Sequence, residues 1–178
     1  RLYDRSGEHV LYSLENPAAT DRQVLNLDTS QANYFPDSLI TATLAVSDPG
    51  FWQHPGFRLD TLNPNQSPTL AQRLVSDLLL WNEPQGIRRA MRERLLAAQI
   101  TSRYGRERVL SWYLNTANYG RLAFGADAAA RVYFGKTAGE LTLAEAALLA
   151  AISETPALNP LDAPVAARDR QRAALEIM

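Results

Sequence analysis

One apolar segment constrains the fold of this chain more than any other part of the sequence. Apart from one threonine and one glutamate, residues 141–152 are all leucine, alanine or isoleucine. Thr142 stands near the start of this run and Glu145 follows three residues later, which is the spacing of a helix capping box. Apolar side chains then repeat at helical spacing, at Leu143, Ala147, Leu148 and Ala151. A helix this apolar belongs in a hydrophobic core, so the segment predicts an α-rich fold.

Helical spacing and helix-breaking residues divide most of the remaining chain into further helices. Gly105 is typical of a helix end, and proline is typical of a helix start. The predicted helices begin at Pro36, span 70–81, 87–104, 107–114 and 125–134, and begin again at Pro164. Residues 1–15 have the pattern of a short hairpin, and residues 55–68 that of a loop rich in proline, asparagine and glycine. We therefore predict a mainly α fold with a short N-terminal β-hairpin.

Composition excludes several classes of protein. The chain has 178 residues, which suits one domain. Its net charge of −1 gives no electrostatic reason to bind nucleic acid. It contains no cysteine, so disulfides and thiolate metal sites are absent, and no apolar run is long enough to span a membrane. The sequence begins at Arg1 without a methionine, so we expect a piece excised from a longer, membrane-anchored protein.

The segment from residue 47 to residue 56 carries the first chemical motif. It reads Ser-Asp-Pro-Gly-Phe-Trp-Gln-His-Pro-Gly. It resembles the opening motif of the peptidoglycan glycosyltransferases, carbohydrate-active family 51, where the pattern is Glu-Asp-x-x-Phe-x-x-His-x-Gly. The matching positions are Asp48, Phe51, His54 and Gly56. The leading glutamate, which that family uses as its catalytic base, is Ser47 here.

The second half of the chain is similar to the same family at several ordered motifs. They lie at residues 103–115, 129–136 and 141–150, and Asn159-Pro160 closes the series. The resemblance covers about residues 1–161. It implies a lysozyme-like α fold and a single family 51-like domain over residues 1–178.

The family's reaction makes two chemical demands. A sugar hydroxyl attacks the anomeric carbon of a lipid-linked glycan, so a carboxylate must take the hydroxyl proton. A lipid pyrophosphate leaves, so cationic or hydrogen-bonding groups must stabilise its charge. Ser47 is a poor base, because an alkoxide is not available near neutral pH. Asp48 is adjacent, but successive helical side chains diverge by about 100°, so it would reach the vacated position only after local rearrangement.

Glu93 matches a second glutamate of the family, which is retained in this chain. Arg89 and Glu93 take their places in a segment that resembles the family's Arg-Lys-x-x-Glu-x-x-x-Ala, with Ala90 in place of the lysine. Four residues separate Arg89 from Glu93, so the two side chains share a helix face and could pair. Taken without the resemblance, this is an ordinary surface ion pair.

The second family motif, Gly-Gly-Ser-Thr-Ile-Thr-Gln-Gln, is altered at most positions. Thr69 and Gln72 remain, and Ser76 replaces a lysine that follows the motif. Arg73 could supply a replacement cation at a different spacing. The loop before this motif is short and polar, so it is unsuited to the membrane-dipping role that the family gives it.

Substrate-binding candidates follow from the resemblance. Arg131 and Lys136 match basic residues near the substrate phosphates, although the same pattern describes a solvated surface pair. The resemblance assigns the histidine that matches His54 to local structure. The full set is Phe51, His54, Thr69, Gln72, Arg73, Arg89, Arg131 and Lys136, beside the catalytic positions Ser47, Asp48 and Glu93.

Three functions remain open. We expect a peptidoglycan glycosyltransferase-like domain with no more than trace polymerisation, which binds a lipid-linked precursor or glycan strand or acts as a scaffold. The alternatives are an active glycosyltransferase with a rebuilt site, and a lysozyme-like hydrolase that would use paired carboxylates. The resemblance implies the extracytoplasmic face of the bacterial inner membrane and partners in cell-wall synthesis. It also allows a divalent cation, Mg²⁺ or Mn²⁺, as cofactor.

Overall fold

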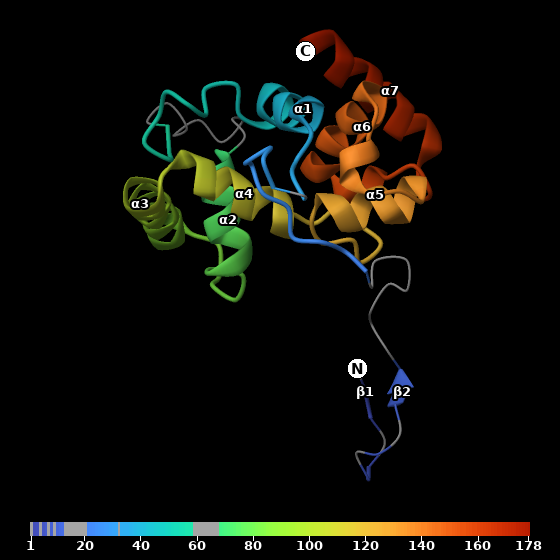
Figure 1. Ribbon diagram of the computed structural model, residues 1–178. Coiled ribbons are helices and arrows are strands. Elements are labelled where there is room, and N and C mark those ends of the chain that lie inside the picture. Colours follow the sequence, from blue (N-terminus) through green and yellow to red (C-terminus); the bar gives the residue numbers. More distant parts are fainter. Residues whose placement is uncertain are drawn as a thin grey trace.

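Helices dominate the structure of this chain. The computed structural model describes residues 2–3, 5–6, 8, 10–12, 21–31, 33–58 and 68–178. In Figure 1, α2 and α3 lie on one side of the helical body and α6 and α7 on the other, with α1 and α4 between them. The mainly α, lysozyme-like fold predicted from the sequence is confirmed.

The helix bounds agree with most of the predicted spans. The α-helices are α1 (Asp37–Ser47), α2 (Leu70–Leu78), α3 (Ile87–Tyr104), α4 (Arg106–Thr116), α5 (Ala126–Phe134), α6 (Leu143–Glu154) and α7 (Pro164–Ile177). Two short 3₁₀ helices, η3 (Ala138–Glu140) and η4 (Pro156–Leu158), flank α6. Helix α2 ends earlier than its apolar spacing predicts. The amides of Leu79 and Leu80 both bond to the carbonyl of Val75, which closes the helix and buries Leu80.

The apolar helix α6 lies in the core, as its sequence predicts. Its eight residues from Ala146 to Ser153 are all buried. The capping box is present, because Thr142 accepts from the amide of Glu145 and Glu145 accepts from the amide of Thr142. Helices α1 and α7 pack directly against α6. The C-terminal end of α6 is thereby fixed beside the C-terminal end of α1.

Two short strands lie at the N-terminus. Strand β1 (Leu2–Tyr3) pairs antiparallel with β2 (Val10–Tyr12), with Leu2 opposite Tyr12 and Tyr3 opposite Val10. Residues 4, 7 and 9 of the predicted turn, and residues 59–67 of the predicted loop, are outside the described residues. The hairpin as a whole therefore stays a prediction.

Alkaline pH is expected to destabilise the fold through Tyr133. Burial, and secondarily the charge of Asp162, raise the pKa of Tyr133 to about 12, and its hydroxyl donates to the carbonyl of Tyr119 at 2.6 Å. Between pH 10 and pH 12 the unfolded chain loses this proton while the folded chain keeps it. The contribution of Tyr133 to the free energy of unfolding is therefore fully present below pH 10 and is lost as pH rises to 12.

Tyr133→Phe tests this link in denaturant unfolding at pH 8 and at pH 11. The variant is expected to lose about 1 kcal/mol at pH 8, the net value of one hydrogen bond. It is also expected to show a shallower decline at pH 11 than the parent protein. An equal decline in both proteins would assign the alkaline loss to the other buried tyrosines, Tyr113 and Tyr119, whose pKa values are also raised by burial.

Candidate active-site cleft

A cleft of about 830 Å³ opens between α2, α3, the end of α4 and the end of α6. Polar and charged side chains from all four helices line it. Four of the predicted site residues face it, namely Gln72, Arg73, Arg89 and Glu93. Tyr113, Ser153 and Glu154 also line it, and the sequence analysis gave them no role in a site.

Gln72 positions the retained carboxylate Glu93. The side chain of Gln72 is buried and its Nε2 donates to Glu93 Oε1 at 2.9 Å. The same side chain belongs to the capping box of α2, in which Gln72 Oε1 accepts from the amide of Thr69 at 3.3 Å. The first turn of α2 therefore orients Glu93 on the neighbouring helix α3.

Arg89 places a cation where the family motif has a lysine. Its guanidinium is buried, donates to Ser76 Oγ at 2.6 Å and also donates to the carbonyl of Glu83 at 2.9 Å. Ser76 stands at the lysine position of the second motif, so a positive charge remains there although the lysine does not. The expected pairing of Arg89 with Glu93 is not formed, because each side chain is bonded to another partner.

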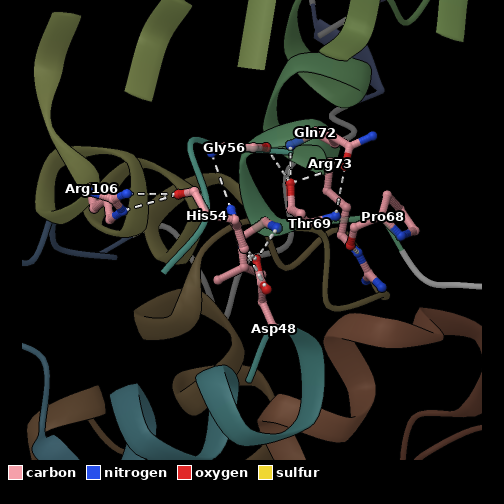
Figure 2. A network of polar contacts seen from close by, with 9 residues as sticks. Asp48, His54, Gly56, Pro68, Thr69, Gln72, Arg73 and Arg106 are labelled. Atoms are coloured by element: carbon pink, nitrogen blue, oxygen red, sulfur yellow. Dashed lines mark hydrogen bonds and ion pairs between the residues drawn. The ribbon is translucent and has the colours of Figure 1, made fainter. Parts of the chain in front are cut away.

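Asp48 and His54 form a buried network outside this cleft. Asp48 is fully buried, and its carboxylate accepts from His54 Nε2 at 2.9 Å and from the amide of Leu70 at 3.1 Å. His54 Nδ1 accepts from the amide of Gly56 at 3.1 Å, so the ring proton is on Nε2. Figure 2 shows this network joining the first motif to the start of α2. Asp48 is thus committed to structure and does not face the cleft.

The remaining contacts of the first motif also have a structural role. Thr69 is buried, and its hydroxyl donates to the carbonyl of Gly56 at 2.6 Å (Figure 2). Phe51 is buried and packs edge-on against Trp52 and His54, with ring centroids at 5.0 Å and 6.3 Å. These side chains hold the loop after α1 against α2, and none of them lines the cleft.

Glu154 is one of the cleft residues for which the sequence predicts no role. It is the last residue of α6, and its carboxylate accepts from the hydroxyl of Ser47, the last residue of α1. Arg73 Nη2 lies 2.5 Å from the other carboxylate oxygen. Burial lowers the pKa of Arg73, but interactions with Glu154 and Tyr113 together outweigh it, so the pKa is raised. No local spacing reveals this contact, because 107 residues separate Ser47 from Glu154.

Arg131 and Lys136 lie outside the cleft. Arg131 Nε is 2.9 Å from Asp127, one helical turn earlier on α5. Lys136 Nζ is 2.7 Å from Glu145 at the start of α6. Neither basic residue lines the cleft, and neither does Ser47, which Glu154 covers. Ser47 and Lys136 therefore do not share this cleft with Glu93.

The helical fold and the cleft lined by carboxylates and guanidinium groups agree with the lysozyme-like class of domains. The family model described as Transglycosylase matches residues 14–178, so the chain belongs to this family. It is a peptidoglycan glycosyltransferase-like domain.

Curated relatives agree with this assignment. The chain is 36% identical to penicillin-binding protein 1A of Aquifex aeolicus over 157 residues, which cover 80% of this chain and 21% of that protein. It is 34% identical to the biosynthetic peptidoglycan transglycosylase of Pectobacterium atrosepticum over 139 residues, or 71% of this chain and 56% of that protein. The chain thus spans about a fifth of the penicillin-binding proteins and just over half of the transglycosylase.

Proposed function

We propose that this domain binds a lipid-linked disaccharide precursor of peptidoglycan in the cleft and polymerises it at no more than a trace rate. The observation that carries the proposal is the joint placement of Gln72, Arg89 and Glu93 on one cleft wall. Ser47, which stands at the position of the family's base, supplies no carboxylate there.

The cleft holds two cations, Arg73 and Arg89, beside three carboxylates, Asp77, Glu93 and Glu154, and the cations are the groups that could bind a pyrophosphate. Arg73 and Arg89 each present a guanidinium, whose planar donors match phosphate oxygens in pairs. Leu78 and Trp81 line the same cleft and are 49% and 73% exposed, which provides an apolar wall beside the cationic one. A ligand with a sugar, a diphosphate and a lipid chain would satisfy both kinds of surface.

A dedicated site for a divalent cation does not fit the side chains present. Among the described residues, no group of three or more histidine or carboxylate side chains converges as metal ligands. Glu154 pairs with the guanidinium of Arg73, whose positive charge disfavours a second cation beside the same carboxylate. The proposed reaction therefore includes no step through Mg²⁺ or Mn²⁺.

The proposed setting is the extracytoplasmic face of the bacterial inner membrane. The name of one relative, a biosynthetic peptidoglycan transglycosylase, places that protein in peptidoglycan synthesis, and the proposed substrate is anchored in lipid. Within the part of the chain that the structure describes, no helix has the length and hydropathy to cross a membrane. We propose that a segment outside this chain supplies the attachment, and that other cell-wall synthesis proteins are its partners.

Binding and turnover of a fluorescent lipid-linked disaccharide in detergent micelles test this function. The parent domain is expected to bind it and to form only trace polymer, while Arg89→Lys is expected to bind about 10-fold more weakly because a bidentate phosphate contact is lost. Arg170→Lys, on exposed α7, is the matched control. The absence of binding by the parent would refute the proposal. Release of new reducing ends from preformed glycan strands would instead favour the hydrolase.

A further inference from the structure

We infer that Glu154 is the general base of this cleft, in place of the carboxylate missing at position 47. The inference rests on the proposed function, because it concerns the same cleft and the same substrate. It assigns the trace turnover to a residue from a different helix, and it explains how a domain with Ser47 retains any route for proton transfer.

The geometry places the Glu154 carboxylate directly over Ser47. Ser47 and Glu154 are the last residues of α1 and α6, two helices that pack together. Ser47 is 3% exposed and is absent from the cleft wall, whereas Glu154 lines the cleft and bonds to the Ser47 hydroxyl. A carboxylate therefore faces the cleft at the site that a longer side chain at position 47 would enter.

Helix stability does not account for a glutamate at this place. A negative charge at the C-terminal end of a helix opposes the helix dipole, and here the C-terminal ends of α1 and α6 lie together. Arg73 compensates for that charge through its ion pair with Glu154. The hydrogen bonds from Ser47 and Arg73 use two of the roughly four acceptor positions of a carboxylate, so others remain for a substrate hydroxyl.

In the proposed step, the proton moves to Glu154 as the family's glycosyl transfer takes place. As the acceptor hydroxyl oxygen forms a bond to the anomeric carbon of the growing chain, its proton moves to Glu154. The bond between the anomeric carbon and the pyrophosphate oxygen breaks, and the electron pair leaves with the lipid pyrophosphate. Glu154 then releases the proton to water.

Glu154→Gln tests the assignment in long incubations with the fluorescent lipid-linked disaccharide. Polymer formation is expected to fall at least about 100-fold, the usual range for a lost general base, while substrate affinity changes no more than about threefold. Glu176→Gln, an exposed glutamate on α7, is the matched control and is expected to keep the parent rate. Circular dichroism confirms that each variant is folded.

Exchanging the residues at positions 47 and 154 tests whether the reaction needs a carboxylate at this place in the cleft, whichever helix supplies it. Ser47→Glu alone crowds two carboxylates and is expected to remain at or below the parent rate, whereas Ser47→Glu with Glu154→Ser is expected to equal or exceed it. Parent-level polymerisation by Glu154→Gln overturns the assignment, and so does substrate binding by the parent without any turnover. Failure of the parent to bind substrate instead refutes the proposed function.

Discussion

Replacing Asp48 with alanine is expected to lower the free energy of unfolding by about 3 kcal/mol. The change leaves two buried donors without an acceptor, His54 Nε2 and the amide of Leu70, which lie 2.9 Å and 3.1 Å from the carboxylate. Each unsatisfied buried group costs about 1–3 kcal/mol. For a chain of this length the melting temperature should fall by on the order of 10 °C.

Asp48→Asn is the matched comparison, because its amide oxygen still accepts one of these bonds. We expect it to lose roughly half as much stability in the same thermal and urea unfolding experiments. If Asp48→Ala unfolded at the parent's temperature, the network in Figure 2 would not be a stabilising element and a role for Asp48 in the reaction would regain support.

Gly56→Ala is expected to destabilise the protein by roughly 3–5 kcal/mol, from backbone strain and overpacking together. Gly56 has φ of +102°, and an added Cβ would lie 2.5 Å from the carbonyl oxygen of Ala97 and 2.4 Å from Thr101 Oγ1. The loop would have to move off α3, and Thr69, which bonds to the Gly56 carbonyl, would move with it.

Gly50→Ala serves as the control for Gly56→Ala in the same loop. Its added Cβ would meet the His54 ring at 3.8 Å, an ordinary contact, so near-parental stability is expected. Urea unfolding of the two variants compares them directly. Equal stability of Gly50→Ala and Gly56→Ala would contradict the close approach of this loop to α3.

The fold could be predicted from the sequence where local signals act alone. Helix α6 follows from its capping box and leucine spacing, and α3 ends at Gly105, as predicted. The end of α2 could not be predicted in this way, because Leu79 continues the apolar pattern while the chain already turns to bury Leu80.

The candidate site was predictable only in part. Gln72, Arg89 and Glu93 face the cleft because two helices carry them at the family's spacing. Lys136 does not, because the start of α6 offers it Glu145 as a partner. Glu154 lies in the cleft through the packing of α1 on α6, which no spacing within either segment encodes.

The amide of Gln72 performs two tasks, and this couples local dynamics to the cleft. Its oxygen closes the first turn of α2 and its nitrogen donates to Glu93, so rotating the amide by half a turn would break both contacts at once. Fraying of that turn therefore frees the Glu93 carboxylate at the same moment. Hydrogen exchange at the amides of Thr69 and Gln72 would then report how often the carboxylate is unrestrained, and a bound ligand that engages Glu93 should slow or quicken that exchange.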